Sequence, residues 1–206
     1  PFATINYATN QASSSDSILV YEGLYTELDN YGKHMFISSI HYPDIDSTTI
    51  QNTQVGNVDF TLLTQYISDK MEINGFFING DGLHISSNGV TDTVYINNCH
   101  IMNNKTGSGA TISSNVIAKF QNCIFENNYH GITNYDSHVY ILNSKIRNND
   151  CSESGYAEHL YGSAIYGNYN NQGSISIINT EISDNIGQNT IYLLYSGITT
   201  FSLIMD

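Results

Sequence analysis

The sequence has few basic residues and no long apolar run. Its 206 residues include six lysines and arginines against nineteen aspartates and glutamates, a formal net charge of −13. Proteins bind nucleic acids and anionic membrane surfaces through clusters of their own positively charged residues, so the composition argues against either as a partner. No apolar stretch approaches the roughly 20 residues of a membrane-spanning helix, so we do not expect membrane insertion.

Patterns of helical and metal-binding proteins are also missing. After about residue 15 no segment keeps a helical spacing of apolar residues, and the leucine consensus of leucine-rich repeats is absent. The three cysteines include no C-x2-C pair, which argues against a zinc site. No cofactor is expected; calcium is the one metal for which scattered acids, Asp44, Asp46 and Asp81, offer partial ligands.

A short phrase recurs along the chain, in which two apolar residues flank polar or small ones. The second apolar residues are Ile78, Ile101, Phe125, Ile146 and Ile182, at steps of 23, 24, 21 and 36 residues. Within the phrases apolar and polar residues alternate at period two, which favours strands. A period in the low twenties is typical of a coiled solenoid, and the longest step contains an insertion.

The polar residues inside the phrases indicate bends. Asn98, Asn122, Asn143 and Asn179 occupy the same place in successive phrases, and asparagine tolerates left-handed backbone. We expect their side-chain amides to stack as a ladder. Cys99 and Cys123, one residue further on, are expected inward as free thiols on neighbouring rungs, about 4.8 Å apart.

The chain resembles right-handed parallel β-helix proteins of the pectate-lyase-like superfamily. The residues that carry this resemblance are the opening Thr4-Ile5-Asn6-Tyr7-Ala8, the segment Gly23-Leu24-Tyr25-Thr26-Glu27 and the two Asn-Cys-x-Ile/Phe-x-Asn-Asn phrases that start at Asn98 and Asn122. The phrases are similar to the repeats of adhesin-like and polymorphic outer-membrane proteins. The resemblance covers nearly the whole chain. It implies an all-β right-handed parallel β-helix and a secreted or cell-surface location, but no particular activity.

We expect one β-helix domain over residues 1–206. Residues 1–16 are expected to form an N-terminal cap with a short helix, since Ile5, Ala8 and Ala12 have helical spacing. Coils then fill residues 17–206, with a loop insertion at 150–163. Ile50 and Ile73 are expected to stand in register, because they are 23 residues apart.

The charged residues argue against catalysis in this chain. Lyases of this fold use an arginine or lysine base, and the only arginine, Arg147, is expected outward beside Glu126, as Lys145 is beside Glu181. The aspartate pairs and Gly-His-Gly phrase of the related hydrolases are absent. A non-catalytic surface module, such as a stalk, adhesin or assembly unit, is therefore favoured; the alternative is a carbohydrate-active enzyme or a tailspike-like depolymerase.

Two regions are candidate binding surfaces. The insertion combines tyrosines with acids, which suits the binding of glycans, since tyrosine stacks on sugars and hydrogen-bonds to them. Its candidate residues are Asp150, Glu153, Tyr156, Glu158, His159 and Tyr161. The last strand offers Phe201, Leu203 and Met205 as an assembly surface, against further coils of the same protein or a stacked protein chain.

Overall fold

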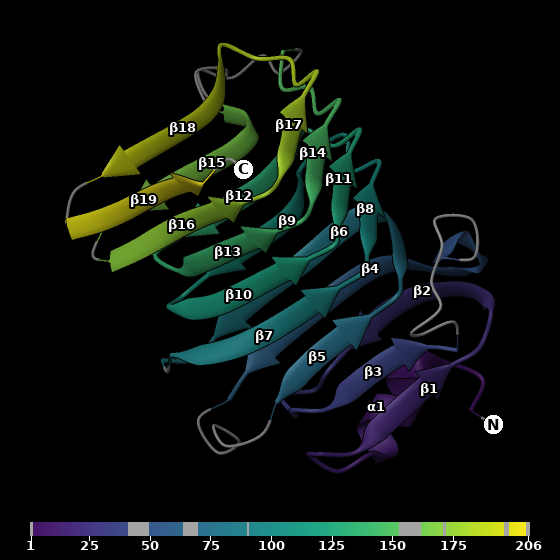
Figure 1. The fold of residues 1–206 in the computed structure, drawn as a ribbon. Coiled ribbons are helices and arrows are strands. Elements are labelled where there is room, and N and C mark those ends of the chain that lie inside the picture. Colours follow the sequence, from purple (N-terminus) through teal and green to yellow (C-terminus); the bar gives the residue numbers. More distant parts are fainter. Residues whose placement is uncertain are drawn as a thin grey trace.

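The computed structural model describes residues 2–40, 50–63, 70–89, 91–152, 162–170, 172–195 and 198–204. Its secondary structure is almost entirely β, with parallel pairing throughout and one short α-helix (Figure 1). The strands lie one above another from the purple N-terminal end to the yellow C-terminal end, so chain segments some twenty residues apart become neighbours.

One sheet contains eight strands in sequence order. They are β1 (Ser17–Val20), β3 (Phe36–Ser39), β5 (Met71–Asn74), β7 (Asp92–Asn97), β10 (Val116–Gln121), β13 (His138–Leu142), β16 (Gln172–Ile178) and β19 (Ile198–Ile204). Each strand pairs in parallel with the next in this order, which places one turn of the chain on the previous one.

The second sheet has eleven strands and divides at β6. Its strands are β2 (Gly23–Asp29), β4 (Thr53–Leu62), β6 (Phe77–Ser87), β8 (His100–Met102), β9 (Ser108–Ser113), β11 (Ile124–Glu126), β12 (His130–Tyr135), β14 (Lys145–Arg147), β15 (Gly162–Tyr169), β17 (Glu181–Ser183) and β18 (Asn189–Tyr195). Strand β6 pairs with β8 through Phe77–Asn79 and with β9 through Leu83–Ile85. From there two rows of strands, β8-β11-β14-β17 and β9-β12-β15-β18, continue separately (Figure 1).

The recurring phrase forms the core as the sequence predicts. Ile78, Ile101, Phe125, Ile146 and Ile182 pair successively across β6, β8, β11, β14 and β17. The first four are fully buried, and Ile182 packs partly buried against them. The 36-residue step from Ile146 to Ile182 keeps this register.

One predicted register is wrong. Ile37, not Ile50, pairs with Ile73 across β3 and β5. Ile50 instead begins a 3₁₀ turn, η1 (Ile50–Asn52), ahead of β4. Equal spacing in sequence fails here because the early turns of the chain differ in length.

The predicted asparagine ladder lies at the bends between the eight-stranded sheet and the β8 row. Asn98, Asn122, Asn143 and Asn179 all have left-handed backbone, with φ between 47° and 55°. The Nδ2 of Asn122 donates to Oδ1 of Asn98 at 3.1 Å, and the Nδ2 of Asn179 donates to Oδ1 of Asn143 at 2.8 Å. The ladder also extends downward, because Asn98 Nδ2 donates to Asn74 Oδ1 at 2.9 Å.

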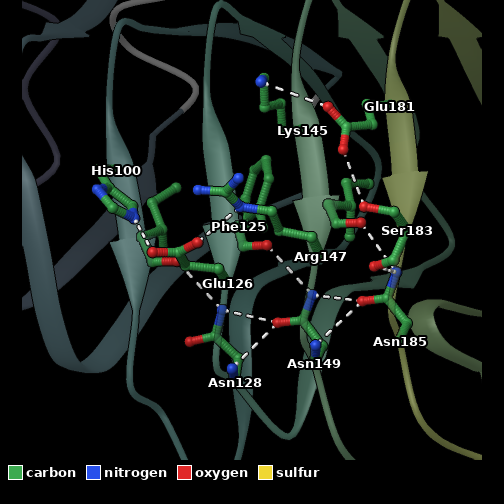
Figure 2. Close-up of polar contacts among 12 residues, drawn as sticks. His100, Phe125, Glu126, Asn128, Lys145, Arg147, Asn149, Glu181, Ser183 and Asn185 are labelled. Carbon is green, nitrogen blue, oxygen red and sulfur yellow. Dashed lines mark hydrogen bonds and ion pairs between the residues drawn. The ribbon is translucent and has the colours of Figure 1, made fainter. Parts of the chain in front are cut away.

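A second, buried ladder comes from residue pairs that follow the strands of the β8 row, most of them Asn-Asn and the last Asp184-Asn185. The first residue of each pair, as in Asn127, Asn148 and Asp184, makes the left-handed bend. The second points inward: Asn149 Oδ1 accepts from the backbone N and the Nδ2 of Asn128 at 3.0 and 3.1 Å, and Asn149 Nδ2 donates to Oδ1 of Asn185 at 2.8 Å (Figure 2). These amides satisfy backbone groups that would otherwise be buried without a partner.

The helix α1 (Ile5–Gln11) lies next to β1 and β2, where the sequence predicts a cap. Thr4 caps its first turn through Oγ1, which accepts from the backbone N of Tyr7 at 3.1 Å. Ile5 and Ala8 are buried against the first strands. Lys33 Nζ donates to carbonyl oxygens of Thr9, Asn10 and Ala12 at 2.6–2.9 Å, which fixes the end of the helix to the β2–β3 connection.

Candidate functional site

A charged cluster lies across three short strands on the outer side of the β8 row. Arg147 Nε donates to Glu126 Oε2 at 2.7 Å, as the sequence predicts. His100 Nε2 lies 3.0 Å from Glu126 Oε1, so both carboxylate oxygens are engaged (Figure 2). Lys145 and Glu181 form the second predicted pair, with 3.4 Å between Nζ and Oε2.

The charged cluster is largely buried at its centre. The side chains of His100 and Glu126 are 11% and 13% exposed, and the ring of Phe77 contacts the imidazole edge-on with centroids 5.1 Å apart. Burial lowers the pKa of His100, and the Glu126 carboxylate offsets part of that shift. The result is a brace that joins β8, β11 and β14, in which each carboxylate oxygen of Glu126 contacts one basic side chain.

An aromatic group covers the outer side of the other row, on and beside strands β12, β15 and β18. It consists of Tyr129, His130, Tyr135, Tyr166 and Tyr192. Tyr166 lies between His130 and Tyr192, stacked on each with centroids 5.9 and 6.2 Å apart. Tyr129 meets His130 edge-on at 4.5 Å, and Tyr135 meets Tyr166 edge-on at 6.0 Å.

The rings of the aromatic group differ in exposure. Tyr166 and His130 are each 8% exposed, Tyr192 is half-buried and Tyr135 is 39% exposed. His130 donates from Nδ1 to the carbonyl of Gly162 at 3.0 Å, and burial lowers the pKa of its imidazole. The inner rings therefore hold the outer ones in place, and the tyrosine edge at Tyr135 and Tyr192 faces solvent. An exposed tyrosine combines an apolar ring with a hydroxyl that can donate or accept a hydrogen bond.

The predicted insertion site is described only in part. Asp150 Oδ1 accepts from the backbone N and the hydroxyl of Ser152 at 2.9 and 2.6 Å, and these bonds lower the pKa of the Asp150 carboxyl. The other five candidates, Glu153, Tyr156, Glu158, His159 and Tyr161, lie outside the described residues. Strand β15 begins at Gly162, so the last two residues of the predicted loop belong to that strand.

The tyrosines that follow the insertion point in opposite directions. Tyr166 is outward, in the aromatic group, whereas Tyr169 is inward and 1% exposed, with its hydroxyl accepting from Asn134 Nδ2 at 2.9 Å. His130, Tyr135 and Tyr192 were not predicted as members of a site. Register identifies Tyr192, because Thr133, Tyr166 and Tyr192 pair across β12, β15 and β18. His130 and Tyr135 lie opposite Ser108 and Asn168, so register does not identify them.

For the predicted assembly residues Phe201 and Leu203 the structure gives the strand pairing. Phe201 and Leu203 lie in β19 opposite Ile175 and Ile177, and Met205 lies outside the described residues. The assembly surface stays a prediction.

All three cysteines are buried, and none of them forms a disulfide. Burial raises the pKa of Cys99 to about 12 and that of Cys123 well above its ordinary value, which keeps both thiols protonated. Among the described residues no group of three or more histidine, cysteine, aspartate or glutamate side chains is placed to share a metal ion. Asp44 and Asp46 lie outside those residues, and the carbonyl of Asp81 accepts from Asn104 Nδ2 at 2.7 Å.

Helix α1 has seven residues. Among the described residues no helix is long and apolar enough to cross a membrane. Comparison with protein-family models, curated proteins and solved structures finds no match for the chain.

Proposed function

We propose that this chain is a right-handed parallel β-helix module of a secreted or cell-surface protein, and that it binds glycans without chemical change at the aromatic group. The observation that carries the proposal is the row of stacked rings from His130 through Tyr166 to Tyr192, with Tyr135 exposed beside it. The stacked inner rings hold Tyr135 and Tyr192 in place, so the exposed parts of these two rings and their hydroxyls can contact a sugar without further ordering.

The connections between the strands support the proposed handedness. After each strand of the eight-stranded sheet the chain passes through the second sheet and then returns to form the next strand of the first sheet. The two successive strands of the first sheet are parallel. Crossover connections between parallel strands of one sheet are right-handed in about 98% of cases. The parallel connections therefore support a right-handed coil and, together with the short repeats, a β-helix of the pectate-lyase-like kind.

The charge balance favours neutral glycans as ligands. A net charge of −13 repels polyanionic saccharides, whereas tyrosine hydroxyls and ring faces bind uncharged sugars. The carbohydrate-active enzyme or depolymerase is the weaker candidate, because the carboxylate of Glu126 is committed to Arg147 and His100. A general acid or base has to be within hydrogen-bond reach of the substrate.

The proposal includes a protein neighbour at β19. This strand is the last of its sheet among the described residues, and a sheet edge pairs readily with another strand. The neighbour would be further coils of the same protein or a stacked chain, with Phe201 and Leu203 at the contact.

An array of neutral and acidic oligosaccharides, followed by titration calorimetry of the hits, tests the glycan proposal. Tyr135→Ala and Tyr192→Ala should each weaken binding about tenfold or more, which is the loss of roughly 1.4 kcal/mol of stacking. Tyr140→Ala is the matched control, because Tyr140 faces outward on the eight-stranded sheet, beside Lys119, and should leave binding unchanged.

Two results would contradict the glycan proposal. One is an array without hits, or hits whose affinity is the same in the parent, Tyr135→Ala and Tyr192→Ala. The other is release of reducing or unsaturated sugar ends by the purified chain, lost in Glu126→Gln, which would assign the enzyme instead.

A further inference from the structure

A groove runs between helix α1 and strand β1, at the N-terminal end of the stack, and encloses about 730 Å³. The helix contributes Ile5, Ala8 and Gln11 to its walls, and the C-cap residue Ala12 adds to them. The strand side contributes residues 16–21 without a gap. Alternate residues of a strand point to opposite faces, so a lining of consecutive residues means that the groove follows the edge of β1.

The backbone of β1 has two sets of hydrogen-bonding groups, one directed to each side. The carbonyls of Asp16 and Val20 accept from the backbone N of Phe36 and Ile40 at 3.1 and 2.9 Å, toward β3. The intervening Ser17 and Leu19 therefore direct their N–H and C=O groups away from β3, along the groove. In the described ranges β1 pairs with β3 alone, so these groups are available to a further strand.

The surroundings of the groove are apolar. Of the nine large apolar side chains that are exposed in the described residues, Phe2, Leu19 and Tyr21 line the groove. The ring of Tyr7 packs against that of Phe2 with centroids 5.3 Å apart, and each of these four side chains is more than half exposed. Exposed apolar side chains gathered in this way mark a contact surface rather than ordinary solvent-facing positions.

The charge of the groove indicates its partner. The lining contains one carboxylate, that of Asp16, and no lysine, arginine or histidine. Asp16 stands at the amino end of β1, and the whole chain carries a net charge of −13. A positively charged residue at the matching end of a partner is therefore favoured, and an acidic partner is disfavoured.

We infer that this groove binds an extended peptide segment of a partner protein, added to β1 as a parallel strand. Its side chains would alternate between small apolar and polar types, with a lysine or arginine next to Asp16. Main-chain hydrogen bonds to Ser17 and Leu19 hold the segment, and the apolar face of α1 covers its other side. A compact apolar ligand would leave these backbone groups without partners, so it fits the groove less well. The inference does not depend on glycan binding.

The probe is a fluorescein-labelled peptide of alternating valine and threonine with two lysines at its amino end, titrated by fluorescence anisotropy. Leu19→Pro removes one groove-facing N–H, a change that the edge of a sheet tolerates, and should weaken binding about tenfold or more. Gln11→Trp fills the groove from an exposed helix position and should have a similar effect. Leu24→Ala, an exposed position outside the lining, is the matched control and should bind as the parent does.

Two peptide controls complete the test. The same peptide with N-methyl groups at every second residue should not bind, and replacement of its lysines by glutamates should weaken binding most at low salt. Circular dichroism checks each variant, and if Leu19→Pro unfolds, Gln11→Trp decides. Binding that is unchanged in Gln11→Trp, or equal for the N-methylated peptide, would overturn the inference. So would self-association of the parent that Gln11→Trp abolishes, which would assign the groove to a second copy.

Discussion

The asparagines of this protein have two separate roles, although they are adjacent in the sequence. In the pair Asn148-Asn149, Asn148 takes the left-handed backbone with φ of 55°, and Asn149 is fully buried with its amide bonded on both sides. The bend needs only a residue that tolerates positive φ, whereas the buried amide has to donate and accept at the same time. The two positions therefore differ in how they respond to substitution.

We expect Asn149→Ala to lower the free energy of unfolding by about 3 kcal/mol, because it leaves the backbone N of Asn128 and the carbonyl of Phe125 buried without partners. Asn122→Gly, at a left-handed bend, should cost less than about 1 kcal/mol, since glycine adopts that conformation freely. Urea denaturation of both variants measures the difference. Equal losses would show that the buried ladder contributes nothing beyond the bend.

Two histidines predict a dependence of stability on pH. Burial holds the pKa of His100 and of His130 below the value in the unfolded chain, which is about 6.5. As pH falls through that value the unfolded chain takes up protons that the folded chain does not, so the free energy of unfolding decreases. The double variant His100→Gln, His130→Gln should show a smaller decrease than the parent in urea denaturation at pH 7.5 and 5.5. Parallel curves for the two proteins would contradict this.

Within a strand, the inward residues predict the register with neighbouring strands better than the outward residues do. Inward residues repeat as Ile101, Phe125 and Ile146, so their spacing predicts a register that the strand pairing confirms. Outward residues obey no such rule: Thr133, Tyr166 and Tyr192 share one row but not one residue type. The charged pair Arg147–Glu126 was predictable because residues of opposite charge on neighbouring strands are expected to pair. The aromatic group could be recognised only once the strands on either side of the 36-residue step were aligned.

Strand β11 allows a direct comparison of its two faces. Phe125→Ala should lower the free energy of unfolding by about 3–5 kcal/mol, because the fully buried ring packs edge-on against Phe120 with centroids 5.1 Å apart. Ile124→Ala, one residue earlier on the half-buried outer face, should cost less than about 1 kcal/mol. Thermal and urea unfolding of the two variants check this, and similar losses would contradict the assigned inward face.

For the whole molecule, local repetition made the architecture predictable and local irregularity limited the prediction. The parallel stack, the cap helix and the first asparagine ladder follow from spacing and residue type. The position of Ile50 could not be predicted in this way, because the early turns of the chain vary in length and equal spacing in sequence then does not imply pairing. The buried ladder was missed because its asparagines read as ordinary turn residues until the inward direction of Asn128 and Asn149 was known.

A stack in which each turn of the chain contacts mainly its neighbours should open from its ends. Hydrogen exchange measured by mass spectrometry should therefore give the highest protection in β8, β11 and β10 and lower protection in β1 and β18. Protection that is uniform along the chain would contradict this, since it would require the stack to open only as one unit.

The ladders also determine how the molecule can change in length. Each joint between successive turns of the chain is made by the same groups, strand amides and asparagine side chains, so one joint is chemically equivalent to the next. Residues 122–142 supply one complete layer, and Asn143 follows Leu142 as Asn122 follows Gln121. An in-frame duplication or deletion of such a layer changes the height by one strand spacing, about 4.8 Å, and presents the same cross-section to whatever adjoins it. Growth by whole layers is thus open to this chain without redesign of its interior.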